Sequence, residues 1–161
     1  MLLQNLHFHH PWWSYITRSH GWQCDHTSFD AQFLHMSAQT LFSIIESSAH
    51  PNFTTLYNSL GIKESKISSM RKAIAALKKL QPDFIVAEFF YGYGNNYAGV
   101  NISNLDVLLY SLQKYSAQTK VIVLVDKREF QYVDKLNEII MLHDVFKFPV
   151  NKDQLQKSLT R

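Results

Sequence analysis

Three short apolar runs in the second half of the chain end at side chains that could take part in chemistry. Residues 84–87 lead to Glu88, residues 120–125 lead to Asp126, and the run that begins at Val145 leads to Phe148. Short apolar runs that alternate with helical patterns are typical of a parallel sheet covered on both faces. Ligands and reactions in such folds lie beyond the carboxyl ends of the strands. Two carboxylates at that edge could perturb each other and transfer protons, which makes them the first candidates for a functional role.

No motif that would bind a substrate or stabilise an oxyanion accompanies these carboxylates, and we expect no enzymatic activity and no cofactor. Segment 1–30 holds all three tryptophans, Cys24 and five of the eight histidines. The spacing His20-x3-Cys24-x-His26 offers soft ligands but matches no established zinc signature, so we expect no metal site. We interpret 1–30 as an aromatic and histidine-rich extension that packs on the following domain, 31–161, or on a partner chain.

A loop rich in glycine and tyrosine follows Glu88 and precedes the next helical pattern. Its spacing, G-x-G-x-x-x-x-G, matches neither the dinucleotide fingerprint nor the phosphate-binding loop of nucleotide hydrolases. Three interpretations stay open: a nucleotide-like small-molecule site, a contact surface for another protein, and a lid packed on its own domain. The candidate residues are Tyr91, Gly92, Tyr93, Gly94, Tyr97 and Gly99.

Composition limits the class of protein. The 161 residues suit a single domain, no apolar stretch approaches the roughly 20 residues of a membrane helix, and no signal peptide is recognisable. A single cysteine fits a reducing compartment, so we expect a cytoplasmic protein without membrane contact. Residues 61–80 carry six basic side chains against the single acid Glu64. We favour a solvated helix face over a nucleic-acid surface.

Periodicity predicts five strands alternating with five helices, which is typical of a doubly wound α/β fold. Ser103 and Asn151 are the expected caps of two helices, and the residue before Pro82 should end another. The predicted strands are 31–37, 52–59, 84–90, 120–126 and 145–150. The predicted helices are 39–48, 65–80 or 68–80, 103–115, 128–142 and 152–161.

Three phrases in this pattern resemble the receiver domain of response regulators. Residues 80–88, with Pro82-Asp83 ahead of an apolar strand, are similar to the approach to the phosphorylated aspartate. Residues 119–124 are similar to the fourth strand, and 146–155 to the fifth strand and the last helix. The resemblance covers 31–161 and implies a flavodoxin-like, five-stranded parallel sheet of order 2-1-3-4-5, with a cis peptide before Pro149.

The chain departs from the family at each position that the family's phosphoryl chemistry requires. The phospho-acceptor position is Glu88, and the acidic pair that would hold Mg²⁺ falls at Ser37 and Ala38. The hydroxyl position is Val125 and the lysine position is Phe148, with Lys147 directed to the other face. Phosphoryl transfer depends on neutralising the charge of the phosphoryl oxygens, so we predict a degenerate receiver that takes no phosphate.

The resemblance therefore implies a pseudo-receiver that meets a protein partner in a signalling pathway. We expect a homodimer through 128–142 and 145–159, with the N-terminal extension as an alternative contact. Retained phosphotransfer with shifted residues, a sensor using the Tyr91–Gly99 loop, and nucleic-acid binding through the basic helix are the alternatives. Glu88 could either mimic a phosphorylated aspartate or accept hydrogen bonds from neighbouring loop amides.

Overall fold

Five parallel strands form one sheet with the order β2-β1-β3-β4-β5 in the computed structural model, which describes residues 38–92 and 102–161. The flavodoxin-like topology that the resemblance implied is confirmed. The predicted strand 31–37 and the extension 1–30 lie outside the described residues. The strands are β1 Thr40–Ile44, β2 Lys63–Ile67, β3 Phe84–Phe89, β4 Lys120–Val125 and β5 Asp144–Lys147.

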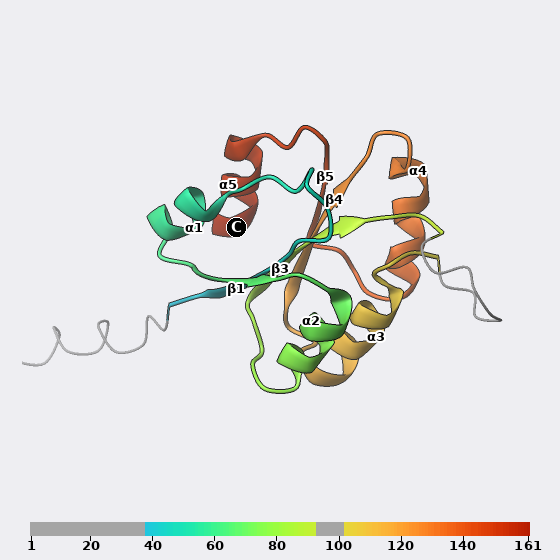
Figure 1. Ribbon diagram of the computed structural model, residues 1–161, viewed down its shortest axis with the longest axis horizontal. Helices are drawn as coiled ribbons and strands as arrows, with labels where there is room; N and C mark the ends of the chain where they lie inside the picture. The colour runs from blue at the N-terminus through green and yellow to red at the C-terminus, as the bar shows by residue number, and fades with distance from the viewer. Residues whose placement is uncertain (1–37, 93–101) are drawn as a thin grey trace, which may run out of the picture. The chain divides into compact units, whose positions relative to one another are not determined.

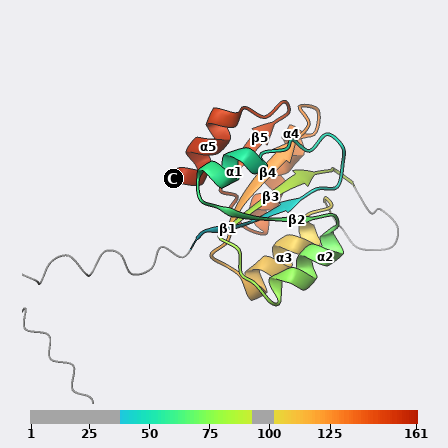
Figure 2. The same cartoon turned by 60° about the vertical axis from the view of Figure 1, so that its left-hand side comes forward.

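Helices cover both faces of this sheet (Figure 1). The helices α1 and α5 lie on one face, and α2 and α3 lie on the other, as the turned view in Figure 2 also shows. Each face has its own apolar cluster, because alternate residues of the buried strands point to opposite sides. The helices are α1 Thr54–Ser59, α2 Met70–Leu77, α3 Asp106–Tyr115, α4 Phe130–Val133 with the 3-10 helix η1 Asp134–Glu138, and α5 Lys152–Thr160.

The first two elements of the described chain are the reverse of those predicted. We expected a helix over 39–48 and a strand over 52–59, whereas the structure has β1 and α1 there. The apolar spacing of the first segment fits either structure, and a short apolar run does not distinguish a buried strand from a helix. In the second segment, packing of Leu56 and Tyr57 on the sheet overrides the strand preference of threonine and the aromatic residues.

The basic segment splits into an edge strand and a helix that is shorter than either predicted range, 65–80 or 68–80. Strand β2 pairs only with β1, and its lysines suit an edge that must not pair further. Helix α2 then begins after Ser69, whose side chain accepts a hydrogen bond from the Lys72 N–H. All six basic side chains of 61–80 belong to exposed residues.

The C-terminal elements largely match their predictions. Asn151 caps α5 by accepting hydrogen bonds from the N–H groups of Asp153 and Gln154, which confirms the expected cap. The peptide between Phe148 and Pro149 is cis, as the resemblance implied. Where one helix was predicted over 128–142, the chain forms α4 and η1 instead. In the part of the chain that the structure describes, no helix has the length and apolar character to cross a bilayer.

Candidate functional site

The carboxylate of Glu88 is sealed at the end of β3, with 1% of the residue exposed. All six residues of β3 are buried because the strand lies in the middle of the sheet. Ser47 Oγ donates a 3.1 Å hydrogen bond to Glu88 Oε1. The ring of His50 brings Nδ1 to 3.1 Å from the same oxygen, off the line of a hydrogen bond. Glu88 Oε2 has no hydrogen-bond partner among the described residues.

Ser47 and His50 come from the connection between β1 and α1, which crosses the end of the sheet. The parallel register pairs Ile44 with Ala87, so the residues that follow β1 run beside Glu88. One of the two interpretations of Glu88 has loop amides hold its carboxylate, but the groups that contact this carboxylate are a hydroxyl group and an imidazole. The sequence does not identify Ser47 or His50 as site residues. It predicts a helix over 39–48, and therefore does not place the residues that follow at the end of the sheet.

Asn104 joins the ends of β1 and β3. Its Nδ2 donates to Glu46 Oε2 at 2.7 Å and to the backbone carbonyl oxygen of Glu88 at 2.9 Å. Its Oδ1 accepts from the Phe90 N–H at 2.9 Å. Carboxylate and carbonyl oxygens are the ligands that a hard divalent cation prefers. An uncharged amide nitrogen lies within hydrogen-bond distance of both of them.

Local hydrogen bonds fix Asn104 just ahead of α3. Asp106 Oδ1 accepts from the Ser103 N–H at 3.0 Å and from Ser103 Oγ at 2.7 Å. Ser103 Oγ in turn accepts from the Leu105 N–H at 3.0 Å. Ser103 was the expected N-cap, but the helix begins later, with Leu105 in the capping position. An isolated antiparallel bridge pairs Tyr91 with Ser103.

The assignment of the family's acidic-pair position to Ser37 and Ala38 is corrected by the position of β1. Ala38 is exposed and precedes β1, and Ser37 lies outside the described residues. The prediction assumed a first strand at 31–37, but the residues that follow the first described strand are Ile45 and Glu46. If the first strand had been assigned to 40–44, the sequence alone would have put Glu46 at the family's acidic-pair position.

The remaining receiver-site positions carry no charge toward Glu88. Val125 is fully buried at the end of β4. Phe148 is partly buried and packs against the apolar cluster of the α1 and α5 face. Lys147 instead places its Nζ 3.6 Å from the centre of the Phe130 ring on α4. The exposed Asp126 accepts from the Arg128 N–H at 2.8 Å, and no contact joins it to Glu88.

These residues do not fit the divalent ion that the receiver fold implies. Glu46 is engaged by the Asn104 amide, and Glu88 by Ser47 and His50. Across residues 38–92 and 102–161, no three histidine, cysteine or acidic side chains gather as a metal site would require. The histidines and Cys24 of segment 1–30 lie outside that range.

The aromatic loop contributes one described contact surface. Tyr91, 43% exposed, stacks on Tyr132 with ring centres 3.8 Å apart and planes inclined by 13°. Lys135 Nζ lies 5.7 Å from the centre of the Tyr91 ring and 5.8 Å from that of Tyr132. Gly92 has a φ of 66°, which a glycine adopts without strain. The other candidates of this loop, Tyr93, Gly94, Tyr97 and Gly99, lie outside the described residues.

Solved structures with the same arrangement include receiver domains of response regulators. The receiver domain of a Francisella response regulator matches with 18% identity and a TM-score of 0.56, over 76% of this chain and 93% of that one. A response regulator receiver protein from Sinorhizobium medicae matches with 14% identity and a TM-score of 0.55, over 78% and 94%.

A third match is a Burkholderia pseudomallei response regulator with a phosphorylated aspartic acid and a calcium ion, at 17% identity and a TM-score of 0.50. It covers 75% of this chain and 66% of that one. No protein-family model matches the sequence, and no curated protein does. Identities this low show a shared receiver fold and leave the chemistry to this chain's own residues.

Proposed function

We propose that this chain is a signalling module with a receiver-like fold that acts through protein–protein contact, without aspartyl phosphorylation and without enzymatic activity. The observation that supports this proposal most directly is the sealed Glu88 carboxylate. With 1% of the residue exposed and Ser47 Oγ and His50 Nδ1 both at Oε1, a phosphoryl donor would have to displace the β1–α1 connection.

Charge supports the same proposal. Phosphoryl transfer depends on cations that offset the charge of the transferred oxygens. Here an amide of Asn104 lies beside Glu46, and an aromatic ring stands at the lysine position, Phe148. The neighbouring Lys147 is engaged with Phe130 on α4. A phosphoryl group at Glu88 would therefore add negative charge to a cluster that already holds two carboxylates.

The test is exposure of the full chain to acetyl phosphate and Mg²⁺, followed by intact-mass measurement. We expect no adduct on the native chain, as on its matched control Glu88→Gln. A double variant, Glu88→Asp with Phe148→Lys, restores two of the family's groups and shows whether the assay can detect transfer in this fold. An adduct present on the native chain and absent from Glu88→Gln would overturn the proposal.

We further propose that a second copy of the chain contacts the face formed by α4, β5 and α5. Phe130, in α4, is 36% exposed, and Met141, in the connection from η1 to β5, is 86% exposed. Large exposed apolar side chains are typical of contact surfaces. Sedimentation velocity over a concentration series tests the dimer. Met141→Glu should shift it to monomer, whereas Tyr110→Ser, at a 59% exposed position on α3, should not. A native chain that stays monomeric would exclude the dimer while leaving the phosphorylation result untouched.

A further inference from the structure

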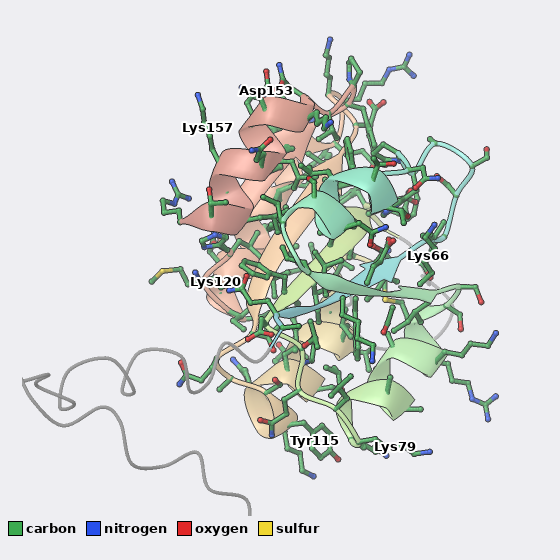
Figure 3. The ribbon with its side chains drawn as sticks, turned by 90° about the vertical axis from the view of Figure 1, so that its left-hand side faces the viewer. Lys66, Lys79, Tyr115, Lys120, Asp153 and Lys157 are labelled. Atoms are coloured by element: carbon green, nitrogen blue, oxygen red, sulfur yellow. The ribbon has the colours of Figure 1, made fainter. Side chains whose placement is uncertain are left out.

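A half-open cavity of about 150 Å³, with both polar and apolar lining, lies beside the site, under the β1–α1 connection and against the edge strand β2. Lys66, labelled in Figure 3, marks the side of the cavity that β2 provides. A cavity of about this volume can hold a six-membered ring such as benzene. Its lining residues are Ile45, His50, Pro51, Asn52, Glu64 and Lys66.

The negative charge of Glu64, in the wall of this cavity, is only partly balanced by a positive charge. Its side chain is only 8% exposed, and its nearest cation, Lys66 Nζ, lies 4.0 Å from Oε2. Ser43 Oγ and Thr54 Oγ1 each donate a 2.6 Å hydrogen bond to the carboxylate. These hydroxyl groups satisfy its hydrogen bonding but bring no positive charge, and buried charges in proteins are normally paired.

His50 forms the wall between the cavity and Glu88. Its side chain is 3% exposed, and its Nδ1 has no hydrogen-bond partner among the described residues although Glu88 Oε1 lies 3.1 Å away. A molecule in the cavity would therefore contact the same imidazole that contacts the carboxylate at the end of β3. Lys66, by contrast, keeps a side chain that is 49% exposed and can move toward a ligand.

We propose that this cavity binds a small neutral amino acid in its zwitterionic form. The ammonium group of the amino acid supplies the positive counter-charge that the Glu64 carboxylate lacks. The carboxylate of the amino acid accepts hydrogen bonds from Lys66 and from the side-chain NH2 of Asn52. The Oδ1 of Asn52 already accepts from the Thr54 N–H at 3.1 Å. Ile45 and Pro51 provide an apolar wall for a side chain of one or two heavy atoms. This inference rests on the cavity and not on the proposed absence of phosphorylation.

The test is calorimetric titration of the full chain with glycine, alanine and serine. Methylammonium and acetate, each carrying one of the two charges, are the controls. We expect the amino acids to bind with a dissociation constant below about 1 mM, and at least about tenfold more tightly than either control, because each charged group contributes. No heat from any of the three amino acids would mean that the cavity holds only water, and would overturn the proposal.

Variants locate the binding. Lys66→Met should weaken binding at least about tenfold, and Lys63→Met, an exposed lysine on the same strand that does not line the cavity, should leave it unchanged. Glu64→Gln should abolish the preference for amino acids over acetate. Because Glu64 is buried, a circular-dichroism melt checks whether the Glu64→Gln variant is folded. If Glu64→Gln is unfolded, the comparison of Lys66→Met with Lys63→Met provides the test. Equal binding of acetate and alanine, or binding unchanged in Lys66→Met, would exclude a zwitterion site.

Discussion

Replacing Asn104 with alanine tests whether one amide holds the strand ends together. The change removes the donor to Glu46 and to the Glu88 carbonyl oxygen, and the acceptor of the Phe90 N–H. A hydrogen bond to a charged group contributes about 1.5–3 kcal/mol and a neutral one about 1 kcal/mol. Since Asn104 is only 9% exposed and the three bonds are coupled, we expect a loss of about 3 kcal/mol.

Urea unfolding measures this loss directly, and thermal unfolding should show a Tm lower by about 10 °C. Asn137→Ala is the matched control, because Asn137 Oδ1 accepts one exposed 3.3 Å hydrogen bond, from the Leu142 N–H. That control should change stability by less than about 1 kcal/mol. Asn104→Asp keeps the acceptor for the Phe90 N–H but sets a carboxylate against Glu46, so it should be no more stable than Asn104→Ala. A loss below about 1 kcal/mol for Asn104→Ala would refute the reasoning.

The same variant also tests whether the amide occupies a cation's place. Without Asn104, the Glu46 carboxylate and the Glu88 carbonyl oxygen present oxygen ligands that Mg²⁺ accepts. At about 10 mM Mg²⁺, a dissociation constant of about 1 mM would stabilise Asn104→Ala by about 1.4 kcal/mol. The native chain should gain nothing from the same addition. Equal stabilisation of both proteins would show that the amide does not exclude the ion.

Three further predictions concern the frame around the site. Burial, and then the Glu64 carboxylate, raises the pKa of Tyr57 above its ordinary 10.0. Because the folded chain keeps a proton that the unfolded chain loses, its stability should fall as the pH rises above about 10, and urea unfolding of Tyr57→Phe should show a smaller fall. Gly61 has a φ of 69° with no atom within 4 Å of an added Cβ, so Gly61→Ala should lower stability by about 1 kcal/mol through backbone strain alone. Leu109→Ala, at a fully buried position of α3, should cost about 2–5 kcal/mol in the same assay. Tyr110→Ala, at the exposed neighbouring position, should change stability by less than about 0.5 kcal/mol. A larger loss of stability in Tyr110→Ala than in Leu109→Ala would contradict the orientation of α3.

The strands that the sequence predicted well are those whose character is fixed locally. The runs 84–87 and 121–125 are apolar throughout because both faces of their strands are buried, and turns bound them. Asn151 caps its helix through groups within three residues, so a short window of sequence contains the whole signal. Glu88 is therefore recognisable as a candidate from its place at the end of an apolar run.

The partners of Glu88 could not be found in this way. Ser47 lies 41 positions from Glu88, and Asn104 lies 58 positions from Glu46. Contacts at these separations depend on the register of the sheet, and the wrong assignment of 39–48 removed that register from the prediction. Strand β2 adds to the difficulty, since an edge strand that carries Lys63, Glu64 and Lys66 lacks the apolar run that identifies β3.

The electrostatics of the strand ends connect the proposals. Glu46 and Glu88 lie at adjacent strand ends, and a receiver that takes phosphate must offset such carboxylates with cations before it adds more negative charge. In this chain the two carboxylates are contacted by an amide, a hydroxyl group and an imidazole. Of these three groups, the imidazole also lines the neighbouring cavity. A ligand that moves the His50 ring would therefore alter the surroundings of Glu88 without any phosphoryl group. A receiver-like fold with Phe148 at the lysine position could respond to a signal in this way, because the response does not require that lysine.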